Sequence, residues 1–551
     1  MKKYFYEIKF FIIMRIICDG IMTVAAASLP ALQKQLFNLF SGKMIQAYLL
    51  LIIITYIICS LSIALFNYLS MIFTWKASLR FEQSLKRDFL KAILNYRYED
   101  FSKKDVGEYL SIQGNDITEL DMDYLTPLID IIQSINKIII FGIFLFVNVD
   151  WRISAIILIG SILTIAIPKI TSTTLGNKKS TYLNQLGLYV SKIKDILDGF
   201  KVIQSRTRHN MNQEHEKVLF QTQKMRYQYG KFKAISMNLE YLSLNLVSAS
   251  AFILAAILLL NHQITIGTCV ATFGYINSFI EPINNLMYDF NSVSSLKPIK
   301  NKVLTFLNNP TKNESRKKLI SVKKFQHKII FENICINYDN FTLSNINCVF
   351  EKGKKYALIG HNGSGKSTMI NVLMTYITPI SGSIKIDHMN INELDTSYIM
   401  YCLNQKEHIF ADNFMNNATV FSSYEEADIH RICNDLGINI IDVIKSKENS
   451  QQLSGGEKQI LGIIRMLAAN ADILLMDEPF AAIDSNTTDL LESRLLSMQD
   501  KTIIMVTHKL SKDLNKFDEI LLMDNGQIVQ RGTYEKVSST VEYQKLKEIQ
   551  N

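Results

Sequence analysis

Residues 356–375 read YALIGHNGSGKSTMINVLMT, and the segment Gly360–Ser367 within them matches the phosphate-binding pattern G-x-x-x-x-G-K-[ST]. A strand-like run ends at Ile359 and a helical run begins at Thr368, as this pattern requires. Glycines allow the backbone N–H groups of such a loop to wrap around phosphate oxygens. The stretch therefore predicts an α/β domain with a P-loop that binds ATP.

Two side chains of this loop have separate tasks in phosphate binding. Lys366 is expected to reach the β and γ oxygens of the nucleotide, and Ser367 to offer its hydroxyl to Mg²⁺. The loop residues expected to contact ATP are Gly360, His361, Asn362, Gly363, Ser364, Gly365, Lys366, Ser367 and Thr368.

A second stretch, Asp472–Pro479, reads DILLMDEP and predicts an apolar strand that ends in two carboxylates. A buried parallel strand presents such groups at its carboxyl end, beside the phosphate loop of a neighbouring strand. Asp477 would hold Mg²⁺ through water, and Glu478 would polarise the attacking water. Taken alone, the stretch would favour a strand end with an acidic pair on the surface. The phosphate loop in the same chain favours the catalytic interpretation.

The length of the chain, 551 residues, is too great for one ordinary hydrophobic core. Long apolar runs occur in residues 1–292, whereas the chain from about residue 329 onward alternates between strand and helix signals. We therefore expect three parts: a transmembrane domain over 1–295, a basic linker over 296–328 and an ATP-binding domain over 329–551.

Six segments are apolar enough to cross a bilayer, which takes about 20 residues of helix. They cover residues 8–32, 45–71, 125–148, 151–171, 238–261 and 265–288. The connections between spans two and three and between spans four and five are long and rich in Lys and Arg, which assigns them to the cytoplasm. Their helical periodicity predicts that the spans continue as long cytoplasmic helices. Both termini and the ATP-binding domain are then cytoplasmic, in a multi-pass protein of the cell membrane.

The formal net charge of +8 is compatible with nucleic acid or acidic lipid as a partner. Because the basic residues lie where the positive-inside rule puts them, membrane lipid is favoured and no nucleic acid is expected. The seven cysteines lack metal-ligand spacing and are expected to be small buried residues in a reduced compartment. Met1–Ile12 lacks the cleavage site of a signal peptide.

Residues 329–551 resemble the nucleotide-binding domain of ATP-binding cassette (ABC) proteins. The resemblance rests on the phosphate loop, on DILLMDEP, on the signature LSGGE at Leu453–Glu457 and on VTHKL around His508. Six spans ahead of such a domain resemble the exporter half-transporters of this superfamily. This implies an all-α six-helix transmembrane domain, a P-loop α/β domain with a helical subdomain, and an ATPase coupled to transport.

The resemblance also implies roles for single residues. Tyr338 would stack on adenine, Gln405 would contact Mg²⁺ together with Ser367 and Asp477, and His508 would act near the γ-phosphate beside Glu478. In this family the signature of one chain caps ATP that is held by a second chain. The residues expected to reach ATP in trans are Ser454, Gly455, Gly456, Glu457 and Asp484.

A chain of this design carries half of each of two ATP sites, so it is expected to work as a dimer. Every element of a competent site is present, which favours a homodimer over a heterodimer. The chain also departs from the family pattern. Ile460 replaces the usual arginine after Gln459, Lys445–Gln452 lacks the glycine-bearing loop of similar exporters, and the interval from Gln405 to the signature is short. These departures bear on how the cytoplasmic loops dock, and not on ATP binding.

Two regions resemble the coupling helices that connect such membrane domains to their ATPase domains. They are Asp105–Asp116 and Asp198–Arg208, with Gly107 and Gly199 as turn residues. The alternative is that both are ordinary solvated helical turns.

Polar side chains within the spans are costly, and they are expected to face inward or toward water. The third span carries such residues on one face and the sixth carries two before a proline. They suggest a cargo path open to the cytoplasm; the alternative is that the carboxylates are interfacial and the lysine snorkels or pairs. The candidates are Asp130, Gln133, Lys137, Asn277 and Glu281.

Three classes of function remain for such a chain. The favoured one is ATP-driven export of an amphipathic small molecule, lipid or peptide, and a peptide would leave uncut because no cysteine-protease domain precedes the first span. An exporter-shaped importer, as for siderophores, is the alternative. A regulatory ATPase without cargo is disfavoured by the six spans.

Overall fold

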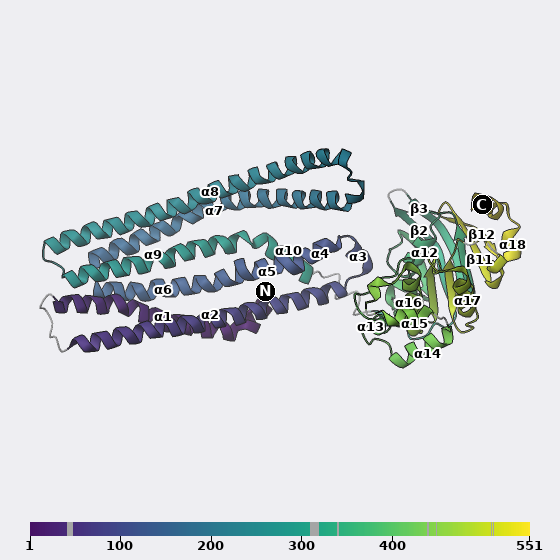
Figure 1. Ribbon diagram of the computed structural model, residues 1–551, viewed down its shortest axis with the longest axis horizontal. Coiled ribbons are helices and arrows are strands. Elements are labelled where there is room, and N and C mark those ends of the chain that lie inside the picture. The colour runs from purple at the N-terminus through teal and green to yellow at the C-terminus, as the bar shows by residue number, and fades with distance from the viewer. Residues whose placement is uncertain are drawn as a thin grey trace. The chain divides into compact units, whose positions relative to one another are not determined.

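The computed structural model describes residues 1–40, 48–308, 319–338, 341–437, 440–447, 449–508, 510 and 512–550. Two compact units are present: Met1–Leu94 with Asp105–Asn309, and Asn95–Lys104 with Pro310–Asn551. Figure 1 shows that the first unit consists of long helices and that the second contains the described strands. Both agree with the fold class that the sequence predicts.

The helices of the first unit are much longer than a bilayer crossing. They are α1 (Lys2–Phe40), α2 (Leu49–Leu94), α6 (Thr126–Asn148), α7 (Trp151–Asp198), α8 (Ser205–Leu260), α9 (Ile266–Ser295) and α10 (Lys297–Asn308). The predicted spans fall on α1, α2 and α6–α9, although residues 45–47 of the second lie outside the described residues. The longest helix, α8, has 56 residues. Apolar runs therefore continue into helical extensions, as expected.

Four described stretches are long and apolar enough to cross a membrane: Lys2–Phe40, Leu49–Leu94, Val106–Asn148 and Ser205–Leu260. A shorter apolar helical stretch covers Trp151–Gly160. The third stretch combines α4 (Val106–Ser111), α5 (Ile117–Leu120) and α6 with two π-helical turns, Ile112–Asp116 and Asp121–Leu125. That the chain crosses the membrane six times stays a prediction.

Helix packing in the first unit divides into two groups. Helix α1 packs on α2, α6 and α9, and α7 lies along α8 (Figure 1). Where α7 meets α8, a Cβ on Gly160 would lie 2.5 Å from Val247 Cγ2, so the absence of a side chain permits the close approach. In the other group the Tyr275 hydroxyl of α9 donates to Ala27 O of α1 at 3.0 Å.

The predicted linker, 296–328, contains a helix in its first part. Leu296, directly before helix α10, and Val303 and Phe306 within it are buried in the first unit, and Phe306 meets Phe89 of α2 with ring centroids 5.9 Å apart. These apolar residues are spaced by helical turns, and this periodicity, which the Pro and Asn content obscured, explains the helix.

The second unit is built on a six-stranded sheet in the order β12-β11-β4-β10-β9-β8. Its strands are β4 (Lys355–Gly360), β8 (Met400–Leu403), β9 (Ile473–Asp477), β10 (Thr502–Val506), β11 (Glu519–Asp524) and β12 (Gln527–Gly532). All neighbours are parallel except β11 and β12. A four-stranded antiparallel sheet, β3-β2-β5-β6, adds β2 (Lys328–Tyr338), β3 (Phe341–Glu351), β5 (Ser381–Ile386) and β6 (Met389–Asn390). A two-stranded pair joins β1 (Ile320–Ser321) to β7 (Leu394–Asp395).

Successive side chains of the central strands point to opposite faces of the sheet, and each face packs into its own hydrophobic core. In β4, Tyr356 and Leu358 point into the core shared with the antiparallel sheet and α12 (Lys366–Leu373). Ala357 and Ile359 point into the opposite core, which the helices cover. This is the period of two that a strand buried on both faces requires.

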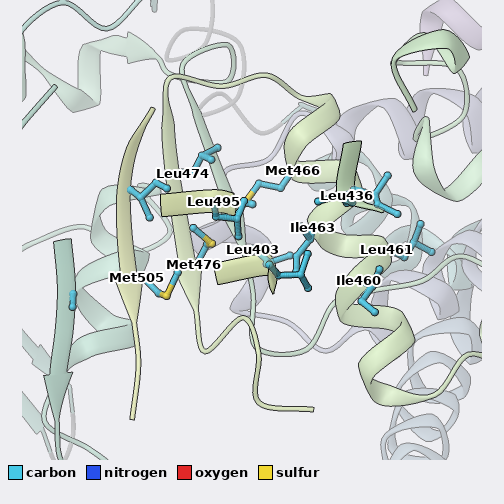
Figure 2. Close-up of a cluster of buried hydrophobic side chains, with 14 of the residues drawn as sticks. Leu403, Leu436, Ile460, Leu461, Ile463, Met466, Leu474, Met476, Leu495 and Met505 are labelled. Carbon is cyan, nitrogen blue, oxygen red and sulfur yellow. The ribbon is translucent and has the colours of Figure 1, made fainter. Parts of the chain in front are cut away.

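The second core holds the helical part of this unit against the sheet (Figure 2). The helices are α13 (Phe414–Ala418), α14 (Glu426–Leu436), α15 (Ile440–Ser446), α16 (Gly455–Ala468) and α17 (Ser485–Leu496), followed by α18 (Tyr534–Ser538) and α19 (Val541–Gln550). Ile460 and Leu461, which stand in place of the expected arginine segment, are buried in this core. The departure from the family pattern is thus absorbed by hydrophobic packing.

The first region expected to act as a coupling helix does not belong to the ATP-binding unit. Asp105–Asp116 belongs to the helical unit, where Asp105 caps α4 and Asp116 pairs with Lys302 at 2.8 Å. Residues 95–104 instead belong to the second unit. Their short helix α3 (Tyr98–Ser102) places the Tyr98 ring 4.5 Å from that of Tyr376, and Glu99 accepts a hydrogen bond from Thr378 at 2.6 Å. The preceding aromatic and acidic residues, not the glycine turn, make the contact.

The second expected coupling region, Asp198–Arg208, forms the turn between α7 and α8. Gly199 ends α7, Phe200–Val202 forms a 3₁₀ turn, and Phe200 and Val202 are exposed. This region keeps its predicted role as a proposal.

Candidate functional site

The phosphate loop joins β4 to α12 through three glycines with positive φ: Gly360 (+153°), Gly363 (+80°) and Gly365 (+103°). A Cβ on Gly360 would overlap Met523 O of the neighbouring strand. A Cβ on Gly365 would lie 2.7 Å from Leu343 Cδ2. Only glycine satisfies both the backbone angle and the space, so the motif is a steric requirement of this turn.

Lys366 begins α12 and is 5 % exposed. Its ammonium donates to Gly360 O at 2.9 Å and to His361 O at 2.7 Å, within the loop that would hold phosphate. Burial lowers the pKa of this ammonium, while the carboxylates of Glu478 and Asp477 act in the opposite direction. The side chain is therefore positioned by the loop itself, with its charge aimed at the nucleotide site.

Asp477 ends β9 next to Ser367 of the phosphate loop. Burial raises the pKa of the Asp477 carboxyl, and its hydrogen bond with the Ser367 hydroxyl opposes that rise. A hydroxyl and a carboxylate are oxygen ligands that Mg²⁺ accepts when phosphates supply others. No cluster of three or more His, Cys, Asp or Glu suited to a metal exists among the described residues. The donor set thus fits a metal ion carried with a nucleotide.

Glu478 is held on both carboxylate oxygens. Its Oε1 lies 2.6 Å from His508 Nε2, and its Oε2 accepts from Gln405 Nε2 at 2.9 Å. The backbone of Glu478 has φ +50°, an uncommon conformation for a residue with a side chain. Such strain persists where the surroundings fix a functional side chain. Sequence reasoning named all three residues, and the structure brings them together.

These residues line one cleft of about 1300 Å³. Its wall is made of Phe341, His361, Asn362, Gly363, Gly365, Lys366, Ser367, Thr368, Gln405, Glu478 and His508. Ser364, also in the loop, is buried. Tyr338 lies in β2, but its side chain falls outside the described residues. Phe341, the first residue of β3, lines the cleft and is a second candidate for stacking on adenine, one that the sequence analysis did not name.

The signature occupies the N-terminus of α16. Ser454 caps this helix through a reciprocal pair with Glu457: Ser454 N donates to Glu457 Oε2 at 2.6 Å, and Glu457 N donates to Ser454 Oγ at 3.4 Å. Ser454 and Gly455 are exposed. The described signature residues are not among those lining the nucleotide cleft. Loop and signature therefore form separate surfaces of this unit.

The segment after Glu478 is seated on the signature helix. A Cβ on Gly456 would lie 2.5 Å from Ala482 O. Gln459 accepts from Ala482 N at 3.0 Å and donates to Gln405 O at 3.4 Å. Asp484 caps α17 by accepting from Thr487 N at 3.0 Å, a bond that lowers the pKa of its carboxyl. These contacts seat Ala482 on the signature helix, two residues before Asp484.

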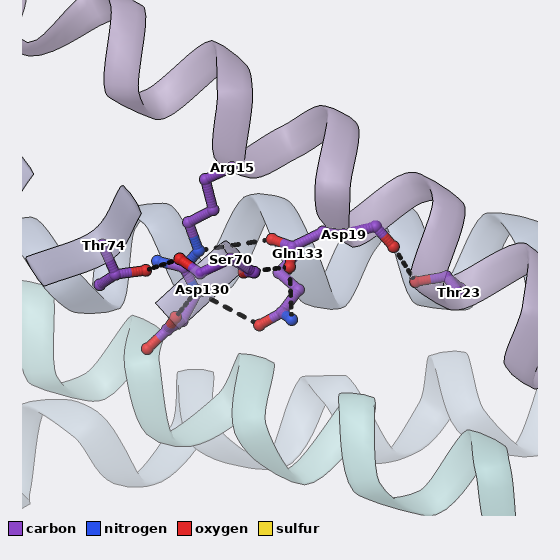
Figure 3. A network of polar contacts seen from close by, with 7 residues as sticks. All are labelled: Arg15, Asp19, Thr23, Ser70, Thr74, Asp130 and Gln133. Carbon is purple, nitrogen blue, oxygen red and sulfur yellow. Dashed lines mark hydrogen bonds and ion pairs between the residues drawn. The ribbon is translucent and has the colours of Figure 1, made fainter. Parts of the chain in front are cut away.

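Two of the polar residues expected along the cargo path, Asp130 and Gln133, form part of a largely buried network in the helical unit (Figure 3). Arg15 of α1 donates to Asp130 and, at 3.4 Å, to Gln133 of α6. Asp19 accepts from Ser70 of α2 at 2.6 Å and from Gln133 at 3.1 Å. Charged groups in such a setting require partners, and these contacts supply them. We call these five residues the Arg15 cluster.

Of the remaining path candidates, Lys137 lies farther along α6, and Asn277 and Glu281 lie in α9. Lys137 of α6 and Glu281 of α9 approach to 3.5 Å, and the Glu281 side chain is 69 % exposed. Asn277 lies in α9, with its side chain outside the described residues. Arg15 and Asp19 were missed, although an i, i+4 pair of opposite charges inside the first span was a readable signal.

Comparison with known proteins identifies the chain. The model of the ABC transporter family matches residues 343–481, and that of the ABC transporter transmembrane region matches residues 12–283. This chain belongs to the ABC transporter family. It is an exporter-type half-transporter, in which a membrane region and one ATP-binding domain share a chain, and an ATPase coupled to transport.

The sequence similarity to known proteins covers most of this half-transporter. The multidrug resistance-like ATP-binding protein MdlB of Buchnera aphidicola is 26% identical over 91% of this chain and 88% of its own length. The ATP-dependent lipid A-core flippase of Photobacterium profundum is 26% identical over 85% and 82%. The structure of a bacterial Atm1-family ABC exporter with ATP bound superposes with a TM-score of 0.83 at 17% identity, covering 99% and 98% of the two chains. The fold is shared along its full length.

Replacing the Glu478 carboxylate with an amide tests its catalytic assignment. Glu478→Gln should keep ATP binding, because Lys366 and the loop are untouched, and slow hydrolysis by about 10²–10⁴-fold through loss of the proton acceptor. Nucleotide binding and phosphate release by the purified half-transporter measure the two effects. Lys366→Ala is the contrasting variant and should fail at binding. Near-wild-type turnover of Glu478→Gln would refute the assignment.

The adenine platform is tested by comparing two aromatic residues. If Tyr338 stacks on the base, Tyr338→Ala should weaken ATP binding by about 1–3 kcal/mol, and Tyr338→Phe should have almost no effect. Phe341→Ala at the cleft wall should then cost less than Tyr338→Ala. Competition binding of ATP against inorganic triphosphate isolates the base contact. A loss confined to Phe341→Ala would transfer the role to that ring.

Proposed function

We propose that two copies of this half-transporter pair head to tail and use ATP hydrolysis to export an amphipathic small molecule, lipid or peptide by alternating access. The names of the relatives, which refer to multidrug resistance and to lipid A-core flipping, support a cargo of this kind. The observation that carries the proposal is the separation of the phosphate loop and the signature onto different surfaces of one ATP-binding domain.

A head-to-tail pair would bring the signature of one chain to the phosphate loop of the other. The exposed Ser454 and Gly455 begin a helix of 14 residues, whose free N–H groups and dipole favour an anion. In the dimer they would face the terminal phosphate of ATP that the partner chain holds on Lys366. Each chain would supply one half of each of two ATP sites. The complete set of catalytic residues favours two identical chains.

Hydrolysis then requires a positioned water more than covalent chemistry. Glu478 would accept a proton as the oxygen of that water bonds to the γ-phosphorus. The bond from the γ-phosphorus to the bridging oxygen breaks, and ADP and phosphate leave. His508 and Gln405 would hold the Glu478 carboxylate in place, through the contacts of 2.6 and 2.9 Å.

Mg²⁺ would be held by Ser367, Gln405 and, through water, Asp477, and when bound it would neutralise charge that develops on the phosphates. The residues of the chain supply the rest. Lys366 would attract the β and γ oxygens, and the glycine loop would donate its N–H groups to them.

The cargo path would follow the polar side chains of α6 and α9. The exposed Glu281 and the adjacent Lys137 would meet polar parts of the cargo, with Asn277 on the same helix as Glu281. The Arg15 cluster would hold α1, α2 and α6 together below them. The long basic connections would place the ATP-binding domain and both termini in the cytoplasm.

The trans arrangement is tested with two broken chains. Ser454→Arg places a bulky cation at the signature, and Lys366→Ala removes the phosphate lysine, so each homodimer should lose both sites. A mixed dimer of the two single variants, isolated with two affinity tags, should regain one complete site. Hydrolysis by this mixed dimer at a fraction of the wild-type rate is the expected outcome.

The matched control carries the same two substitutions on one chain and pairs it with wild type. If sites form in trans, both sites of this control are broken and it should be inactive. If each site lies within one chain, the pattern reverses: the control keeps its wild-type site and the mixed single variants stay inactive. That reversal would overturn the head-to-tail proposal.

Cargo and direction are tested on the protein in lipid. A compound that stimulates ATP hydrolysis should accumulate in inside-out vesicles with ATP and fail to do so with Glu478→Gln. Glu281→Gln should change the half-stimulating concentration of that compound severalfold, whereas Glu216→Gln, which removes the same charge from an exposed part of α8, should not. ATP-driven movement out of inside-out vesicles would refute export.

A further inference from the structure

The first turn of the signature helix contains a negative charge where the proposed dimer would bring a phosphate. Glu457 is the third residue of α16, and its carboxylate accepts from Ser454 N at 2.6 Å. The carboxylate therefore lies at the positive end of the helix. It uses part of the N-terminal N–H capacity that would otherwise serve an anion.

Lys447 contacts the same carboxylate oxygen. Its ammonium lies 2.7 Å from Glu457 Oε2, and the two side chains are 27% and 9% exposed. Lys447 follows α15 directly, so a separate segment delivers its charge to the signature helix. Burial by itself raises the pKa of the Glu457 carboxyl. The hydrogen bonds from Lys447 and Ser454 outweigh this effect and leave that pKa below its usual value.

A glutamate carboxyl is ordinarily ionised at neutral pH, and the contacts with Lys447 and Ser454 N favour that charged form at Glu457. Two like charges a few ångströms apart repel strongly when water is excluded from a closing interface. A terminal phosphate approaching Ser454 would meet this repulsion unless a cation offset it. The structure places such a cation, the ammonium of Lys447, on the Glu457 carboxylate.

We propose that Lys447 is a positioning residue for the trans ATP site: it offsets the charge of Glu457, so that the N-terminus of α16 can receive the terminal phosphate of ATP held by the partner chain. This inference rests on the proposed head-to-tail dimer. Lys447 acts through Glu457 and needs no contact of its own with the nucleotide. The ligand class is a nucleoside triphosphate, because ADP would not extend to the signature.

Removal of the Lys447 charge should act on KM more than on kcat. Lys447→Met should raise the KM for ATP in steady-state hydrolysis by about tenfold or more, because the attraction of a unit charge over a few ångströms grows as the closing interface loses water. The affinity of each chain for ADP should stay unchanged, because the phosphate loop is intact. Lys447→Arg, which retains the charge, should remain close to wild type.

A double variant separates charge compensation from helix capping. Gln at position 457 can still accept from Ser454 N but carries no charge, so in Glu457→Gln the lysine has nothing to offset. Lys447→Met should therefore raise KM in the wild-type background and have almost no effect in the Glu457→Gln background. A purely structural role for Lys447 would give equal KM increases in both backgrounds and a matching drop in melting temperature.

Lys445→Met is the matched control, because it removes the same charge two residues earlier, from the last turn of α15. Its KM should stay at the wild-type value. An unchanged KM in Lys447→Met, or equal effects of Lys447→Met in both Glu457 backgrounds, would overturn the inference while leaving the dimer proposal intact. The reversed result in the mixed-dimer experiment would instead overturn both.

Discussion

The ATP-binding domain depends on the parallel pairing of β8, β9, β10 and β4. In this register Val506 pairs with both Leu358 and Asp477, and Leu403 pairs with Met476. The four strands therefore end at one edge of the sheet. Just beyond that edge follow the phosphate loop, Gln405, Glu478 and His508, which is where open parallel sheets bind ligands. The reacting groups are neighbours because their strands are.

The same arrangement explains the second surface of this domain. The chain continues from Glu478 to a segment that rests on Gly456 and Gln459 of the signature helix. Helix α16 is in turn fixed to the sheet by a buried hydrophobic face. The catalytic edge and the signature are thus rigidly connected while they face different surroundings. In the proposed head-to-tail dimer, a second copy of the chain would bring its signature to the phosphate.

In the helical unit, buried charge imposes the strongest constraint on packing. Arg15 and Asp19 are almost fully buried, and neither could remain there without partners from α2 and α6. Their pairing ties three helices at one level. Lys137 and Glu281 link α6 to α9 at another, where one partner is exposed. The difference in exposure separates a structural cluster from the proposed point of contact with cargo.

The sequence by itself determined what is encoded in continuous segments. The glycine loop from Gly360, the strand that ends at Asp477 and the apolar helices each follow from local spacing, because backbone sterics and periodicity act over a few residues. It also determined the fold class and the role of the chain as an ATPase coupled to transport, through motifs that need only their own residues. The sequence did not predict helices α3 and α10. Their formation depends on apolar residues whose partners lie elsewhere in the chain.

The tertiary structure alone decided which distant side chains meet. The bond between Arg15 and Asp130 spans 115 positions, and Thr378 bonds Glu99 across 279. Phe341 reaches the cleft, and Lys447 reaches Glu457, only because the intervening chain returns to the same place. The secondary-structure propensity of a short segment does not predict such contacts. They arise when burial forces each charge and ring to find a partner in three dimensions.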